Sequence, residues 1–183
     1  FMKEKGLDPA KLKYDYAAPS AQIPMLASGK AQAINFFILT MPGISRMAKG
    51  QKKSAKALFF GDFGLDLYSN GIGAKEDFIR KNPDIIRKFV RASLKGWKDT
   101  FSNPADAATR QKKYAKGLNK QVTIEEIAIL RKLAVTSDTQ KNGLGWFSSA
   151  KVLKNRNFMV KNAKVDPAKA PEATDLFDLR FLP

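Results

Sequence analysis

The sequence predicts an α/β protein built from short apolar strands that alternate with helices. Strand-like and helix-like stretches follow each other with tight joins over the first 60 residues, and helical periodicity dominates after residue 75. The order strand, helix, strand is typical of parallel sheets connected by right-handed crossovers. The hydrophobic content of 44% over 183 residues is enough to bury a core.

The first part of the chain predicts three strands and two helices. An alternating stretch with Tyr14 and Tyr16 favours the first strand, and strongly apolar runs favour the other two. Pro19 marks the start of the first helix, and Gly29 marks its end. We expect strands at 12–18, 31–38 and 57–60, and helices at 19–28 and 41–49.

A Gly- and aromatic-rich stretch, 62–74, is the most informative part of the chain. It continues without a long linker into a short helix that carries Glu76 and Asp77 in its first turn. We interpret the stretch as a strand. Further helices are expected from Asn82 and Pro83, from Asn103 and Pro104, from a capping box of Thr123 with Glu126, and from Ser148 or Ser149 to about Lys161.

The chain contains no cysteine and no histidine. It therefore has no disulfide, no thiolate ligand and no cysteine nucleophile, and it lacks the commonest general base and zinc ligand. We expect no catalytic residue, no metal site and no cofactor. No apolar run approaches the roughly 20 residues that a membrane-spanning helix needs.

The formal net charge of +16 raises the possibility of a nucleic-acid or lipid-surface module. The excess is spread along the chain, with +5 over residues 1–66 and +11 over residues 67–183. The densest basic groups, such as the one at 110–116, are short, and Tyr114 is the one aromatic in that stretch, which is too few for stacking on successive bases. A solvated basic surface therefore fits better, and we expect no nucleic-acid partner.

Several short motifs occur in a characteristic order along the chain. They are Gly6-Leu7-Asp8-Pro9, Pro24-Met25-Leu26-Ala27-Ser28-Gly29-Lys30, Asp62-Phe63-Gly64-Leu65, Asn82-Pro83-Asp84, Lys95-Gly96-Trp97 and Phe181-Leu182-Pro183. With these motifs the chain resembles the C-terminal part of the type II periplasmic solute-binding proteins of bacterial ABC importers. Within that group it is most similar to the branch of thiamine-pyrimidine-precursor binders, beside the nitrate, sulfonate and taurine binders.

The resemblance implies the type II periplasmic-binding-protein fold, in which two α/β lobes joined by a hinge close on a ligand. It also implies that the chain is an N-terminally incomplete piece of such a protein. Residues 1–66 would form most of lobe two, 67–74 the hinge-crossing strand, and 75–183 the mostly helical part of lobe one. The implied protein is a periplasmic monomer, or is lipid-anchored and extracellular in a Gram-positive source.

The function implied by the resemblance is capture of a small molecule and its delivery to the membrane permease of an ABC importer, without chemistry on the ligand. Arg46 is the only arginine in the first 79 residues, so no guanidinium near the expected strand ends could clamp a strong anion. Aromatic and amide side chains are there instead. This favours a flat or weakly polar ligand, such as a thiamine-precursor pyrimidine or another small organic nutrient.

Three aromatic residues are expected to contact the ligand. The resemblance places Tyr68 where a ring stacks on a flat heterocycle, although a half-buried strand tyrosine would explain this residue as well. Phe36 and Phe37 end a strand that should point at the ligand. Because side chains alternate along a strand, only one of these two rings should face it.

Four polar residues complete the expected site. Asn35 offers a donor and acceptors to a polar ligand edge. Ser20 begins a helix, where it could cap the backbone and contact the ligand at the same time. Asp62 and Asn70 could bind a polar ligand, but both also fit an ordinary role in forming turns.

An enzyme is the main alternative that the resemblance brings. The fungal relatives of this branch synthesise the thiamine pyrimidine, and resemble single-turnover enzymes that consume a histidine and bind pyridoxal phosphate and iron. This chain has no histidine, and it lacks the cysteine-rich motif of those enzymes. A pyrimidine-precursor synthase is therefore much less favoured than a binding protein.

Overall fold

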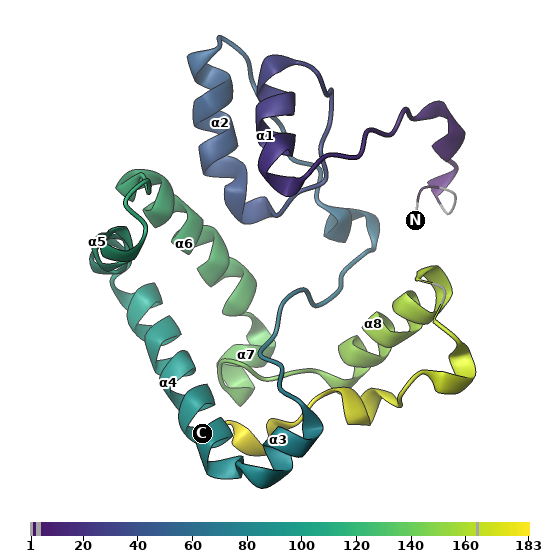
Figure 1. Ribbon diagram of the computed structural model, residues 1–183, viewed down its shortest axis with the longest axis vertical. Coiled ribbons are helices and arrows are strands. Elements are labelled where there is room, and N and C mark those ends of the chain that lie inside the picture. The colour runs from purple at the N-terminus through teal and green to yellow at the C-terminus, as the bar shows by residue number, and fades with distance from the viewer. Residues whose placement is uncertain (1, 3–4, 164) are drawn as a thin grey trace. The chain divides into compact units, whose positions relative to one another are not determined.

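The computed structural model describes residues 2, 5–163 and 165–183, and the chain divides into two compact units, Phe1–Leu65 and Asp66–Pro183 (Figure 1). The first unit contains α1 (Pro19–Ser28) and α2 (Met41–Gly50). The second unit contains α3 (Glu76–Lys81), α4 (Pro83–Ser102), α5 (Pro104–Tyr114), α6 (Lys120–Ala134), α7 (Ser137–Asn142) and α8 (Ser149–Asn162). Short 3₁₀ turns lie at Pro9–Lys11, Ile38–Thr40, Phe60–Phe63, Pro167–Lys169, Ala173–Leu176 and Leu179–Phe181.

No paired strand occurs in the described part of the chain, and the predicted strands 31–38 and 57–60 end in 3₁₀ turns, at Ile38 and Phe60. The backbone is extended at Leu12, Phe37 and Phe59, with φ between −94° and −73° and ψ between 122° and 135°. Segment 67–74 is likewise neither helical nor paired. Local preference therefore produces the strand conformation, but a strand also needs a hydrogen-bonded neighbour, which these segments lack here. The α/β sheet expected from the sequence is thus not seen among the described residues.

Unit Phe1–Leu65 is a pair of helices with well-defined ends, and both helices were predicted. Pro19 occupies the first turn of α1, and Gly29 ends the helix in the left-handed conformation at φ 83°. Lys53 Nζ donates a hydrogen bond of 3.1 Å to the carbonyl of Ala27, in the last turn of α1. Helix α2 packs beside α1 and buries Ile44 and Ala48 on one face.

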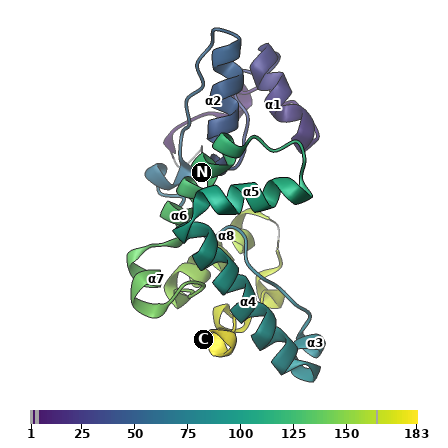
Figure 2. The same cartoon turned by 90° about the vertical axis from the view of Figure 1, so that its left-hand side faces the viewer.

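The core of unit Asp66–Pro183 lies among α4, α5 and α6. Helix α5 lies where α4 ends and α6 begins (Figures 1 and 2), and it packs against both. Ala108 of α5 is fully buried, and a side chain this small lets α5 and α6 approach closely. Phe101 of α4 and Ile127 of α6 are buried in the same unit, as is Phe181 near the end of the chain.

The polar residues that begin the helices were only partly predicted. Asn103 and Ser148 cap α5 and α8 as expected, and each accepts a backbone hydrogen bond from the first turn. The capping box of Thr123 with Glu126 was wrong, because the side chain of Asn119 already accepts hydrogen bonds from the N–H groups of residues 121 and 122. Helix α6 therefore begins at Lys120, and Thr123 lies inside it.

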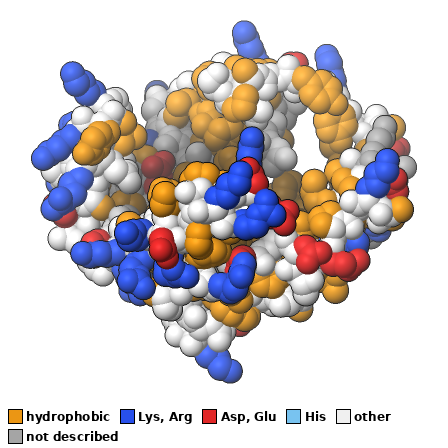
Figure 3. Space-filling view, turned by 60° about the horizontal axis from the view of Figure 1, so that its bottom comes forward, with side chains coloured by type: hydrophobic (Ala, Val, Ile, Leu, Met, Phe, Trp, Pro, Cys, Tyr) orange, Lys and Arg blue, Asp and Glu red, His pale blue; other side chains and the backbone are white. Residues whose placement is uncertain are grey.

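The described surface is basic and partly apolar. Figure 3 shows Lys and Arg side chains spread over the visible face among hydrophobic and acidic ones. In the part of the chain that the structure describes, no helix combines the length and the apolar character needed to cross a membrane.

Glu126 provides a test of packing around α6. Burial of this half-exposed side chain raises the pKa of its carboxyl group. A carboxyl whose pKa is raised in the folded state adds stability at acidic pH, and this contribution is lost as the pH rises through that pKa. We therefore expect Glu126→Gln to increase the free energy of unfolding at about pH 7 and to change it little at about pH 3, below the ordinary pKa of glutamic acid. Urea denaturation at both pH values measures this, and an equal gain at both would contradict the burial argument.

Candidate functional site

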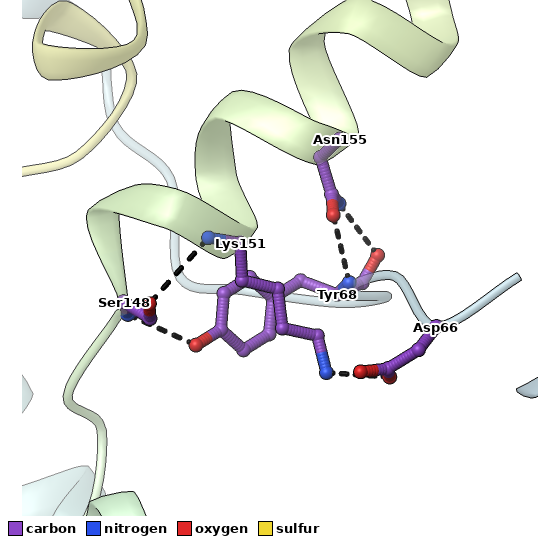
Figure 4. Close-up of polar contacts among 5 residues, drawn as sticks. All are labelled: Asp66, Tyr68, Ser148, Lys151 and Asn155. Atoms are coloured by element: carbon purple, nitrogen blue, oxygen red, sulfur yellow. Dashed lines mark hydrogen bonds and ion pairs between the residues drawn. The ribbon is translucent and has the colours of Figure 1, made fainter. Parts of the chain in front are cut away.

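The backbone of Tyr68 is held by a side chain of α8 (Figure 4). The N–H of Tyr68 donates to Asn155 Oδ1 at 3.0 Å, and Asn155 Nδ2 donates to the carbonyl of Tyr68 at 2.9 Å. A single amide thus satisfies both backbone groups of one residue, as a neighbouring strand would in a sheet. This clamp fixes the extended start of unit Asp66–Pro183 on α8.

The phenol group of Tyr68 contacts the first turn of α8. The backbone N–H of Ser148 donates to the hydroxyl oxygen of Tyr68 at 3.0 Å, and the hydroxyl oxygen of Ser148 accepts from the N–H of Lys151 at 3.4 Å. The Tyr68 hydroxyl therefore acts as an acceptor within the unit. Its own proton has no acceptor among the described residues, so it remains available to a polar group of a ligand.

The ring of Tyr68 is half-buried between an aromatic edge and a cation. Phe147 packs against it in a T-shaped arrangement with the ring centroids 5.2 Å apart, and Lys151 Nζ lies 4.8 Å from the Tyr68 centroid. Lys151 Nζ is also 2.6 Å from Asp66 Oδ1, which holds the ammonium group beside the ring. Because the Asp66 carboxylate is largely exposed, this ion pair adds little stability, about 0–1 kcal/mol, and mainly positions the cation.

The residues beside Tyr68 that sequence reasoning missed are Phe147, Lys151 and Asn155. Lys151 and Asn155 follow the cap residue Ser148 at spacings of three and seven, which places all three on one face of α8. That polar repeat was the available signal. It could not show that Tyr68, 87 residues before Asn155, was the partner of this face.

The other predicted site residue of this unit, Asn70, is exposed two positions after Tyr68. In unit Phe1–Leu65, the rings of Phe36 and Phe37 lie edge-on to each other, with their centroids 6.2 Å apart. Phe36 is half-buried and Phe37 is exposed. No side-chain hydrogen bond of Ser20 or Asn35 occurs among the described residues.

Of two polar residues of unit Phe1–Leu65, Asp62 fits its simpler interpretation as a turn former, whereas Ser20 does not fit its simpler interpretation as a helix cap. Ser20 is exposed in the first turn of α1 but does not cap the helix, because Ala18 holds the cap position. Asp62 is exposed within the 3₁₀ turn Phe60–Phe63, as a turn former would be. The role of all seven residues as ligand contacts stays a prediction. No group of three or more acidic residues in the described part of the chain could hold a metal ion.

The Asn155 clamp can be tested by truncation. We expect Asn155→Ala to lower the free energy of unfolding by about 1–3 kcal/mol, because two partly buried backbone groups of Tyr68 lose their partner. Asn162→Ala is the matched control on the same helix, since its exposed side chain makes only a local hydrogen bond to Phe158. This control should change stability by less than about 0.5 kcal/mol. Equal losses in the two variants, measured by urea denaturation, would rule out the clamp.

Comparison with known proteins places the chain in a family. The model of the NMT1/THI5 like family matches residues 1–107, which is more than half of the chain. A riboflavin-binding protein, RibY of Chloroflexus aurantiacus, is 44% identical over 59 residues, and the match covers 32% of this chain and 16% of that relative. No solved structure matches the chain. These matches confirm the family-level resemblance to binding proteins of ABC importers, and the chain belongs to the NMT1/THI5 like family.

Proposed function

We propose that the chain belongs to the solute-binding component of a bacterial ABC importer, which captures a small flat molecule and delivers it to a membrane permease. The observation that carries this proposal is the Tyr68 ring, which is fixed on α8 and keeps a hydroxyl proton for a ligand. Family membership supports the binding role. We also propose that the protein acts outside the cytoplasm, as a monomer, with no cofactor and no chemistry of its own.

A fused-ring heterocycle is the ligand class that we favour. The relative RibY is described as a riboflavin-binding protein, which supports a flat, aromatic and largely uncharged ligand. A ring such as Tyr68 offers stacking area to a ligand of this kind, and its hydroxyl can donate to a heterocyclic nitrogen or carbonyl. Thiamine-precursor pyrimidines share this chemistry. Nitrate, sulfonates and taurine do not, and they form the less favoured class.

The proposal also includes the two-lobed α/β fold. Under it, the extended segments pair as strands of the lobes, with 1–66 in lobe two, 67–74 crossing the hinge and 75–183 in lobe one. Exposed apolar side chains on one of these segments support strand character, because Leu58 is 81% exposed and Phe59 46% exposed. Apolar surface of this kind is what a paired and covered strand would bury.

Riboflavin binding tests the proposal, with flavin fluorescence as the readout. We expect saturable quenching, and we expect Tyr68→Ala to weaken affinity about tenfold or more, since loss of a stacking ring costs about 1–3 kcal/mol. Tyr68→Phe keeps the ring and should therefore lose less affinity for riboflavin than Tyr68→Ala does. Tyr114→Ala is the control, because that tyrosine lies in the same unit and is 92% exposed.

Stability must be measured beside affinity in this experiment. The contacts of Tyr68 with Phe147 and Ser148 mean that Tyr68→Ala also lowers the melting temperature, so binding is compared where every variant is folded. Unchanged affinity in Tyr68→Ala would contradict the site. If neither riboflavin nor a thiamine-precursor pyrimidine binds, and unrelated DNA binds with a steep salt dependence, the basic-module alternative would replace the proposal.

A further inference from the structure

A separate hollow of about 370 Å³ lies within unit Asp66–Pro183, where residues of α4, α6 and α7 meet. Figure 1 shows α6 ending beside α7. The hollow shares no residue with the Tyr68 cluster. Its lining consists of Lys98, Phe101, Ser102, Arg131, Val135, Thr139, Gln140, Gly143 and Leu144. The volume lies near the lower end of the range of about 300–1,000 Å³ that is usual for sites of small molecules, and the hollow is open to solvent, so a ligand there would stay partly exposed.

One part of the lining is apolar and consists of buried or half-buried side chains. Phe101 is buried, while Val135 and Leu144 are half-buried. Gly143 has φ 97° and ψ 148°, a backbone conformation that is essentially restricted to glycine. The wall at this point therefore depends on a residue without a side chain. These groups offer a surface for the hydrocarbon body of a ligand.

The charged part of the lining carries one sign only. Lys98 and Arg131 both line the hollow, no acidic residue does, and neither cation forms an ion pair with a described carboxylate. Lys98 also ends a basic stripe on α4, formed by Lys88, Arg91, Lys95 and Lys98. The spacings of three, four and three residues put these four exposed side chains on one face of the helix. The stripe adds positive potential near the mouth of the hollow.

The neutral polar groups of the lining differ in whether they can still donate a hydrogen bond to a ligand. The hydroxyls of Ser102 and Thr139 already donate to the carbonyls of Lys98 and Ala134, at 2.8 Å and 2.6 Å. The side-chain amide of Gln140 has no hydrogen-bond partner among the described residues. Its N–H groups can therefore donate to a ligand, together with the guanidinium and ammonium groups.

We propose that this hollow binds a small organic anion, in which a carboxylate is joined to an aromatic or branched apolar body. Arg131 would bind the carboxylate through paired N–H groups, and Lys98 would act as a compact second charge. Phe101, Val135 and Leu144 would contact the apolar body. This site is independent of the proposed importer function, because it uses neither Tyr68 nor any residue of the other unit.

Calorimetric titration with sodium benzoate tests this site. Benzamide has the same ring without the charge, and sodium acetate has the charge without the ring. We expect saturable binding of benzoate, with both comparison compounds weaker by about tenfold or more, since a charge-assisted contact and ring burial are each lost in one of them. A change in the fluorescence of Trp97 gives a second readout. The centroid of its ring lies 5.6 Å from that of Phe101, which lines the hollow.

Matched variants separate the hollow from general attraction to a basic surface. Lys98→Gln and Arg131→Gln should each weaken benzoate binding about tenfold, while Lys95→Gln should change it less than about twofold. Lys95 belongs to the same stripe but does not line the hollow. The melting temperature of each variant checks that it is folded. Absence of saturable binding, equal affinity for benzamide, or an equal loss in Lys95→Gln would overturn the proposal.

Discussion

The two hydrogen bonds between Asn155 and the backbone of Tyr68 are the constraint on which the candidate site depends. An extended segment without a partner strand leaves its N–H and C=O groups unpaired, and burial of such groups is costly. At Tyr68, one amide side chain from α8 satisfies both groups. The position of the ring beside Phe147 and Lys151, and of the hydroxyl beside the start of α8, follows from this attachment.

The helices around the site owe their positions to local signals and to a compact core. Proline in the first turn of α4 and α5 and the serine cap of α8 define where these helices begin. Ala108 brings α5 close to α6, and Phe101 packs into the same unit from α4. The residues that line the hollow lie on α4, α6 and α7 or just beyond them, and α4 and α6 belong to this core.

Sequence reasoning worked where the determining interaction is local. Pro19 and Gly29 delimit α1 through their own backbone preferences, and Ser148 caps a helix whose first turn follows it directly. It failed where the interaction is distant, as with strands that need a neighbour. The start of α6 was missed for another reason, because Asn119 and Thr123 both suit a cap and only the observed hydrogen bonds distinguish them. Tyr68 could be singled out, but its partner Asn155 lies 87 residues away.

The proposed function rests on the attachment of Tyr68 to α8 and on family membership. Amide hydrogen exchange can test both the attachment and the binding of a ligand beside it. We expect the Tyr68 amide to exchange slowly in the free protein, since Asn155 accepts its hydrogen bond, and the amides of the exposed residues near Gly73 to exchange fast. Riboflavin should slow exchange further around residues 66–70 and leave the exposed end of α5 unchanged. Fast exchange at Tyr68 in the free protein, or protection by riboflavin only at residues remote from this segment, would contradict the account.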